Sequence, residues 1–242
     1  MRNFPLFNSR QDSVSLPVKM ISTVIFDLDG LLADTEPLHC RAYQLAMVEH
    51  GVTVSDDDYA DHWVKHGYGI VDWVNWHKLE LDPHALRQRK SEHYLKLLET
   101  SLQPMDGALE LLAGLTGKIR IALASSSYRD AIDGVLAGLK IAHYFEAVVS
   151  GQDVAKVKPA PDIFLQTAER LAVTPSECVV LEDAEKGVVA ARLAGMACVA
   201  VPNPWTRHHD FSQATRVCGS LREIDLTFLR GLAPAINERH LP

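Results

Sequence analysis

Five short apolar runs, rich in Val, Ile and Ala, recur after residue 20 and constrain the fold more than any other feature of the sequence. They cover residues 23–26, 119–124, 147–149, 178–181 and 197–201. Continuous apolar runs of this length are typical of strands that are buried on both faces of a parallel sheet. Helical patterns cover 108–115, 162–171 and 186–194. This alternation predicts right-handed crossovers and a doubly wound parallel α/β sheet.

Residues 36–103 interrupt the alternation. They contain helix-like patterns, such as 38–50 and 86–98, but no convincing strand. A stretch of this length is too long for a loop between two core elements. It also holds seven of the eleven histidines and three of the four tryptophans. We therefore expect a small helical domain over 36–103, inserted into a core domain that is formed by 21–35 and 104–242.

The first twenty residues are expected to lie outside both domains. They are polar, are broken by Pro5 and Pro17, and lack the apolar stretch of a signal peptide. We expect a disordered tail there, with the functional part of the chain beginning near Met20.

Composition and charge exclude several classes of protein. Apolar residues make up 47% of the chain and charged residues 23%, as in ordinary soluble globular proteins. The net charge of -7 argues against a nucleic-acid binder, and the basic cluster 87–90 fits a solvated helix face. No apolar stretch approaches the ~20 residues of a membrane span. Four widely spaced cysteines without a CxxC pair suit a reducing environment. We expect a cytoplasmic monomer or weak homodimer.

Two aspartates stand at the end of the first apolar run, in Val24-Ile25-Phe26-Asp27-Leu28-Asp29-Gly30. Buried carboxylates are costly unless they are paired, neutralised or bound to a cation. The carboxyl end of a strand is also where ligands bind in a doubly wound sheet. Asp27 and Asp29 are therefore candidates for a functional site. Taken alone, the pair also fits turn or helix-capping aspartates ahead of Gly30.

Further polar groups follow the later apolar runs. The second run leads into Ser125-Ser126-Ser127, whose hydroxyl and backbone N–H groups could cradle a phosphate, although a plain helix N-cap also fits. Lys158 stands at the threshold of a helix after the third run, where a solvated lysine is the ordinary alternative. Glu182 and Asp183 follow the fourth run. Because all these groups would meet at one edge of the sheet, they predict a site for a hard cation and a phosphate.

In this combination the sequence resembles the haloacid dehalogenase superfamily. The signature of that superfamily is a DxDG motif, a Ser or Thr after the second strand, a Lys, and an acidic fourth motif. All four occur here in order, as Asp27-Leu28-Asp29-Gly30, Ser125, Lys158 in KPAPD, and Glu182-Asp183. The stretch DLDGLLADTEPLH, residues 27–39, is especially similar to the branch that contains β-phosphoglucomutase and small sugar phosphatases. The resemblance extends from residue 21 onward and implies a Rossmann-like core with a helical cap domain over 36–103.

The resemblance also implies roles for the residues that match. Asp27 would be the nucleophile, and Asp29 would protonate the leaving oxygen and then activate the water that hydrolyses an aspartyl-phosphate. Ser125 and Lys158 would hold the phosphoryl oxygens, with Ser126 as a further substrate-binding residue.

A magnesium site is implied as well. Its ligands would be Asp27, the backbone carbonyl of Asp29, and Asp183, with Glu182 as an additional or indirect ligand. Ligands that are all oxygen suit Mg²⁺.

Several residues of the expected cap have more than one interpretation. Thr35 matches the family branch at the hinge between core and cap. His39 either orients Asp29 or touches substrate, while a surface histidine on a helix is the alternative. His62 and His66 have the spacing of a metal site but lack the Glu of an HExxH motif, so we expect no metal there. The tryptophans at 63, 73 and 76 are expected to form the core of the cap rather than a substrate platform.

The acid at position 29 favours phosphoryl transfer over dehalogenation, because a halide leaves without needing a proton. A phosphomutase similar to β-phosphoglucomutase is an alternative. Such mutases carry a cap arginine shortly after a glycine, whereas Gly67-Tyr68-Gly69-Ile70-Val71 has no cation there. We therefore expect a Mg²⁺-dependent phosphatase for a sugar phosphate or a similar small phosphorylated metabolite. A catalytically silent protein that binds phosphate or a partner on the same fold is the third hypothesis.

Overall fold

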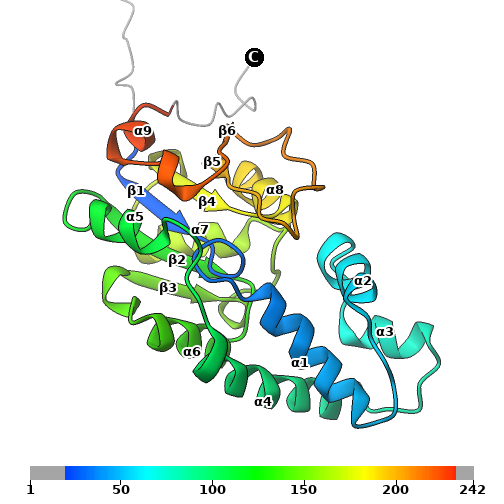
Figure 1. Ribbon diagram of the computed structural model, residues 1–242. Coiled ribbons are helices and arrows are strands. Elements are labelled where there is room, and N and C mark those ends of the chain that lie inside the picture. The colour runs from blue at the N-terminus through cyan, green and yellow to red at the C-terminus, as the bar shows by residue number, and fades with distance from the viewer. Residues whose placement is uncertain (1–19, 233–242) are drawn as a thin grey trace, which may run out of the picture.

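A six-stranded parallel sheet forms the centre of the molecule (Figure 1). This computed structural model describes residues 20–232, so the tail expected over 1–20 lies, apart from Met20, outside the described residues. The strand order is β3-β2-β1-β4-β5-β6, and every neighbouring pair is parallel. The predicted doubly wound sheet is therefore confirmed. The strands are β1 (Thr23–Phe26), β2 (Arg120–Ser125), β3 (Ala147–Ser150), β4 (Cys178–Glu182), β5 (Ala197–Ala200) and β6 (Arg216–Val217).

Five of these strands coincide with the apolar runs of the sequence to within one residue at each end. Strands β1, β4 and β5 are buried along their whole length, because helices cover both faces of the sheet. The sixth strand, β6, consists of two exposed residues that pair with β5 at the edge. No apolar run marks so short and exposed a strand, and the sequence did not predict it.

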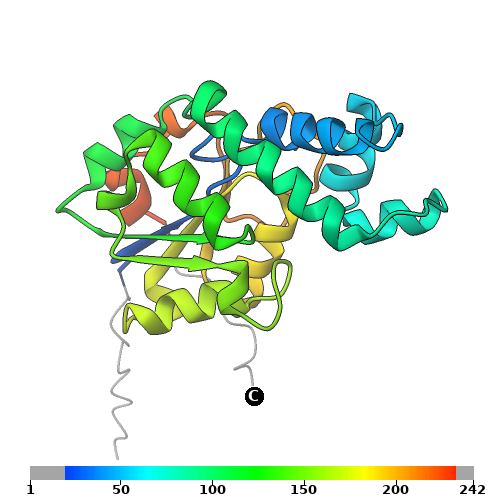
Figure 2. The same ribbon diagram turned by 90° about the horizontal axis from the view of Figure 1, so that it is seen from below.

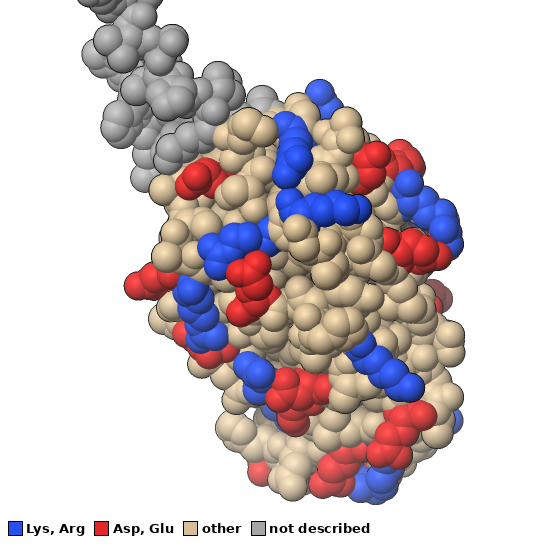
Figure 3. Space-filling view, turned by 90° about the vertical axis from the view of Figure 1, so that its left-hand side faces the viewer, with Lys and Arg blue, Asp and Glu red and all other residues tan. Residues whose placement is uncertain are grey.

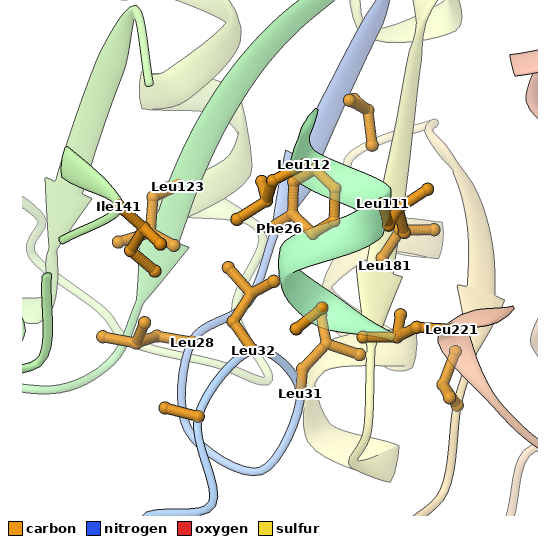
Figure 4. Close-up of a cluster of buried hydrophobic side chains, with 14 of the residues drawn as sticks. Phe26, Leu28, Leu31, Leu32, Leu111, Leu112, Leu123, Ile141, Leu181 and Leu221 are labelled. Atoms are coloured by element: carbon orange, nitrogen blue, oxygen red, sulfur yellow. The ribbon is translucent and has the colours of Figure 1, made fainter. Parts of the chain in front are cut away.

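Helices pack on both faces of the sheet (Figures 1 and 2). One hydrophobic cluster joins the sheet to α5, α6 and α9, and a second cluster joins it to α7 and α8. Figure 4 shows part of the first cluster, which contains Leu112 of α5 and Phe26 of β1. Side chains alternate along β1, so Val24 and Phe26 belong to the first cluster and Ile25 to the second.

Three of these five helices match the predicted patterns, whereas α6 and α9 are additional. The helices are α5 (Ala108–Leu115), α6 (Arg129–Leu139), α7 (Asp162–Arg170), α8 (Glu185–Leu193) and α9 (Leu226–Arg230). Short 3₁₀ turns lie at Ala142–Tyr144, Gly151–Asp153, Pro175–Glu177 and Leu221–Glu223. They connect the larger elements without adding a layer.

Residues 36–103, all of which the structure describes, contain helices and no strand. Helix α1 packs along α4 (Figures 1 and 2). The helices are α1 (Glu36–Val48), α2 (Asp56–Tyr59), a π-helical turn (Ala60–Lys65), α3 (Ile70–Trp76) and α4 (Pro83–Ser101). We refer to residues 36–103 as the cap.

The cap has a hydrophobic cluster of its own, which contains Met47, Trp63 and Trp73. The prediction of a tryptophan core is wrong for Trp76, which is 57% exposed. Its ring lies edge-to-face against the ring of Tyr68 at 4.6 Å, and Tyr68 is itself 40% exposed. Trp76 therefore packs on the outer surface of the cap instead of in its core.

The chain leaves the core and returns to it at one place. The backbone N–H of Asp34 donates to the carbonyl oxygen of Gln103 at 2.9 Å, and Ala33 and Pro104 form an antiparallel bridge. The N–H of Met105 then donates to the carbonyl of Leu32 at 3.0 Å. The two connections between core and cap thus run side by side.

Charged side chains of both signs are interspersed on the face shown in Figure 3. Within residues 20–232, no helix combines the length and the apolar character that crossing a bilayer requires. The four cysteines are all buried and unpaired.

Candidate active site

A cavity of about 280 Å³ lies between the carboxyl ends of the strands and the cap. The parallel register places Phe26 of β1 beside Leu123 of β2 and Leu181 of β4, so the residues that follow these strands meet at one edge. The structure brings most of the predicted site residues together in the lining of this cavity: Asp27, Asp29, His39, Ser125, Ser126, Lys158, Glu182 and Asp183. Thr35 does not line the cavity; it is fully buried, and its hydroxyl is hydrogen-bonded to Asp29.

Lys158 joins the ends of three strands, β1, β2 and β4. Its ammonium group donates to Asp27 Oδ1, to Glu182 Oε1 at 2.6 Å and to the carbonyl oxygen of Ala124 at 2.9 Å. Burial lowers the pKa of Lys158, but the two carboxylates outweigh that effect and hold the pKa above its ordinary value. Burial raises the pKa of Asp27, and the attraction of Lys158 only partly opposes this rise. Lys158 therefore stays charged, and its charge only partly compensates the negative charge of Asp27.

Glu182 is held rigidly from both sides. Its Oε1 accepts from Lys158, and its Oε2 accepts from the backbone N–H groups of Asp183 and Ala184 at 3.1 and 3.2 Å. Its carboxylate also packs against Gly187 in α8, where an added Cβ would lie 1.8 Å from Glu182 Oε1. Position 187 therefore requires glycine for a reason of space. This requirement could not be predicted from the sequence, because Gly187 stands in the middle of a helical pattern.

Asp183 is oriented by Asn203, which lies three residues after the end of β5. The Asn203 side-chain amide donates to Asp183 Oδ2 at 2.8 Å and to the carbonyl oxygen of Gly30 at 3.0 Å. Gly30 has φ +78°, and a Cβ there would lie 2.5 Å from Asp183 Oδ2. Burial, together with the neighbouring Glu182 and Asp27, raises the pKa of Asp183.

Asp29 accepts three hydroxyl hydrogen bonds. Thr35 Oγ1 donates to Oδ1 at 2.8 Å, while Ser125 Oγ and Ser127 Oγ donate to Oδ2 at 3.2 and 2.6 Å. Burial raises the pKa of Asp29, but contacts with His39, Ser127 and Thr35 outweigh it and hold the pKa below the usual range. The Asp29 carboxylate is therefore ionised and fixed in direction.

His39 belongs to the site and is not a surface histidine. Its Nε2 lies 3.5 Å from Asp29 Oδ1, and its ring stacks on Tyr94 with centroids 4.0 Å apart. Lys90 of α4 donates to the other ring nitrogen, Nδ1, at 2.7 Å. The prediction of a solvated helix face over 87–90 is therefore wrong for Lys90, since the packing of α4 on α1 turns this side chain toward the cavity.

Ser126 offers an unused hydroxyl. Its Oγ is buried without a hydrogen-bond partner among the described residues, and the residue lines the cavity. Ser125 differs, because its Oγ donates to Asp29 and accepts from the N–H of Ser127 at 3.0 Å. The hydroxyl of Ser126 is therefore free to bind a ligand, whereas that of Ser125 also holds Asp29.

Asp27, Glu182 and Asp183 form a group that could hold a metal ion. Each offers a carboxylate oxygen, and these oxygens lie within 4.8 Å of one another. All three residues are buried, and the pKa values of Asp27 and Asp183 are raised, first by burial and also by the neighbouring acids. A donor set of oxygens alone, with surplus negative charge, fits a hard divalent cation.

The histidines of the cap form no such group in the described part of the chain. His62 Nε2 contacts the carbonyl oxygen of Gly69 at 3.0 Å, and His66 lies 3.6 Å from Asp61. Their spacing of four residues thus serves packing and a surface ion pair.

The chain belongs to the haloacid dehalogenase-like hydrolases, whose family pattern matches residues 21–195. It is similar to the fructose-1-phosphate phosphatase YqaB of Escherichia coli (strain K12), with 35% identity over 184 residues that cover 74% of this chain and 95% of that protein. It is 32% identical to the probable pseudouridine-5'-phosphatase of Drosophila melanogaster, over 85% of this chain and 92% of that protein. The crystal structure of CbbY from Rhodobacter sphaeroides in complex with phosphate has a TM-score of 0.80 at 28% identity, over 87% of this chain and 99% of that chain. The resemblance found in the motifs is therefore confirmed.

Proposed function

We propose that this hydrolase is a Mg²⁺-dependent phosphatase that acts on the phosphate monoester of a small metabolite, such as a sugar phosphate. The observation that carries the proposal is the convergence of Asp27, Asp29, Lys158 and Asp183 on one cavity. The relatives named for fructose-1-phosphate and pseudouridine-5'-phosphate support this class of substrate.

Asp27 is the proposed nucleophile. Its carboxylate oxygen forms a bond to phosphorus while the bond from phosphorus to the leaving oxygen breaks, which leaves an acyl phosphate on Asp27. Lys158, which is hydrogen-bonded to Asp27, reduces the electrostatic repulsion between the Asp27 carboxylate and the anionic substrate. The hydroxyls of Ser125 and Ser126 would hold phosphoryl oxygens. Catalysis then consists mainly of positioning and electrostatic stabilisation.

Asp29 is the proposed acid and base. In the free enzyme it is ionised, so it must take up a proton together with the substrate before it can protonate the leaving oxygen. The negative charge of a bound phosphate favours that uptake, because like charges raise the pKa of a carboxyl group. In the second half-reaction the ionised Asp29 takes a proton from the water that attacks the acyl phosphate. Thr35 and Ser127 hold Asp29 in the direction that both steps require.

The magnesium ion would be held by Asp27 and Asp183, with the Asp29 backbone carbonyl as a further ligand. Both carboxylate oxygens of Glu182 already accept hydrogen bonds, from Lys158 and from backbone N–H groups. Glu182 would therefore support the magnesium ligands without binding the ion directly. When bound, such an ion offsets negative charge on the phosphoryl group. Asn203 keeps the Asp183 carboxylate pointing into the site.

We also propose that the cap, residues 36–103, is a separate domain and that it opens and closes over the cavity. We propose a cytoplasmic location for the enzyme. The side-by-side connections near Thr35 and Pro104 support a hinge at that place. Equal accessibility of the cavity to solvent exchange, with and without a phosphate mimic and Mg²⁺, would contradict this motion.

The test is phosphate release from a panel of phosphorylated metabolites in the presence of Mg²⁺. We expect turnover of a subset of sugar monophosphates. A mutase would instead convert β-glucose 1-phosphate to an isomer when a bisphosphate primer is supplied. Binding of Mg²⁺ and phosphate without release from any ester would favour the catalytically silent alternative.

A further inference from the structure

The hydrophobic cluster of the cap includes one side chain of the core. Among the described residues, every other member of this cluster belongs to residues 36–103, whereas Trp205 belongs to the loop that follows β5. Trp205 is partly buried, and its ring lies edge-to-face on the ring of Tyr59 in α2 at a centroid distance of 5.8 Å. It does not line the catalytic cavity. Its contact with the cap is therefore not explained by contact with a substrate.

The same loop holds a residue of the catalytic site. Asn203, two positions before Trp205, donates from its side-chain amide to Asp183 Oδ2 at 2.8 Å. Its Oδ1 accepts from the backbone N–H groups of Trp205 and Thr206 at 2.8 and 3.2 Å. The Thr206 hydroxyl in turn accepts from the N–H of Asn203 at 3.1 Å. These hydrogen bonds close a turn over residues 203–206, so that a displacement of Trp205 is transmitted to Asn203.

The cap touches the core in a second place, where α4 packs on α6 (Figure 1). The helices approach closely, since a Cβ at Gly134 would lie 2.9 Å from Leu98 Cδ1 and one at Gly138 would lie 2.7 Å from Leu102 Cδ2. Separation of α4 from α6 would expose the buried Leu98, whereas release of Trp205 exposes one ring that is already partly exposed. Trp205 is therefore the contact that is easier to break when the cap moves.

We propose that Trp205 is a positioning residue that couples closure of the cap to the binding of Mg²⁺. This inference rests on the proposed function, in which Asp27 and Asp183 hold the ion beneath a cap that opens and closes. In the closed state Trp205 packs in the cap cluster and fixes the 203–206 turn. The fixed turn keeps the amide of Asn203 on the Asp183 carboxylate. When the cap opens, Trp205 loses its packing and the turn holds Asp183 less firmly.

The coupling acts in both directions. A ligand that closes the cap strengthens the binding of Mg²⁺, and Mg²⁺ favours the closed cap by the same factor. The magnesium site is then fully ordered only when the cap encloses a substrate, as in other enzymes that complete their sites by closure.

The experiment measures the dissociation constant of Mg²⁺ by titration calorimetry, alone and in the presence of the reaction products. The products are inorganic phosphate and the sugar that is released from the best substrate of the panel. The ratio of the first constant to the second reports the coupling. Direct attraction between Mg²⁺ and phosphate contributes to this ratio in every variant, so the change on substitution is the test.

We expect Trp205→Ala to lower this ratio by about tenfold, within the range of roughly 5- to 150-fold that is typical of coupled sites. The dissociation constant measured without products should change by less than about twofold, because the ring has no partner in the open state. Trp205→Phe should keep most of the coupling, since it keeps an aromatic ring against Tyr59.

Two further variants separate the turn from the rest of the cap. Pro204 is exposed, and Pro204→Gly should also lower the ratio, because it loosens the turn between Asn203 and Trp205 and keeps both of their side chains. Trp76→Ala is the matched control, since Trp76 is a tryptophan on the outer surface of the cap. It should leave both constants unchanged.

Amide hydrogen exchange measures the coupling in the other direction. Mg²⁺ alone should slow the exchange of cap residues 56–65, which include Tyr59, in the wild-type protein. This slowing should be lost in Trp205→Ala and kept in Trp76→Ala.

Two results would overturn the coupling. One is a wild-type ratio of the two constants in folded Trp205→Ala. The other is an equal loss of Mg²⁺ affinity with and without the products, which would show that Trp205 only supports the fold of its loop. A failure of the proposed function gives a different result, because the folded wild-type protein would then release phosphate from no ester of the panel.

Discussion

The cavity has a core wall, formed by the residues that follow the strands, and a cap wall, formed by residues of 36–103. The two walls are built differently. On the core wall the carboxylates are fixed by several partners each, as in Asp29 with its three hydroxyl donors and Glu182 between Lys158 and two N–H groups. The cap wall consists mainly of aromatic rings, and Glu36 has a single hydrogen bond. Rigid groups suit the reacting atoms, which need one geometry. A wall of aromatic rings with few fixed polar groups suits a choice among leaving groups. The comparison predicts that changes in the core wall abolish turnover and that changes in the cap wall redirect it.

The largest effect is expected for Asp27→Asn. Removal of the nucleophile should lower kcat by at least about 10⁴-fold, as for other residues that form a covalent intermediate. Steady-state phosphate release measures the loss, and circular dichroism checks the fold. Asp34→Asn is the matched control in the same loop, where the side chain is exposed and should not matter. Turnover by Asp27→Asn at more than a few per cent of the wild-type rate would refute the nucleophile assignment.

Removal of divalent metal should have the next largest effect. We expect EDTA to lower kcat by about 10³-fold, because the buried acids Asp27 and Asp183 would then face the phosphate without a compensating cation. Added Mg²⁺ should restore the rate in an assay of phosphate release. Full activity in the presence of EDTA would remove the metal from the proposed mechanism.

Gly187→Ala tests how tightly the core wall is packed. A Cβ at this position would lie 1.8 Å from Glu182 Oε1, so Glu182 would have to move away from Lys158. We expect a loss of about 2–3 kcal/mol in the free energy of unfolding, as for overpacking combined with a disturbed buried ion pair. Gly114→Ala is the control, since its Cβ would meet nothing within 4 Å and should stabilise α5 by up to about 1 kcal/mol. Urea unfolding of both variants measures the difference, and equal stabilities would contradict it.

Lys90→Met should have the smallest effect on turnover. Lys90 belongs to the cap and influences the core wall only through His39, which contacts Asp29. Loss of the hydrogen bond to His39 Nδ1 should lower kcat by about tenfold. Burial lowers the pKa of Lys90 to about 8, so the lysine is charged below that pH and loses its proton as the pH rises through it. The wild-type rate should therefore decline above about pH 8, and this decline should be absent in Lys90→Met. Lys65→Met, which removes an exposed cap lysine, should keep the wild-type profile.

The central strands of the sheet could be predicted from the sequence, because each is a continuous run of buried residues. Each central strand appears as an apolar run, because both of its faces are covered. Asp27 and Asp183 could be named as candidates because a carboxylate directly after such a run is conspicuous. The two-residue strand β6 could not be predicted, since nothing in Arg216–Val217 distinguishes it from a loop.

The partners of the candidate residues could not be predicted, because they act across long separations in sequence. Asn203 binds the carbonyl of Gly30, which is 173 positions away, and Lys90 reaches His39 across 51 positions. Lys90 looked like part of a solvated basic cluster, and only the packing of α4 on α1 gives it a role. Gly187 is a similar case, since its significance depends on where Glu182 points.

The paired connections at Asp34 and Gln103 have a consequence for how such enzymes diverge. Because the two ends of the insert already touch, a different cassette can replace it without a new path through the sheet. The entropy of closing the inserted loop also grows only slowly with its length. A sheet of this kind can in this way serve different leaving groups by exchange of a single insert, because Asp27, Asp29 and Asp183 all lie outside residues 36–103.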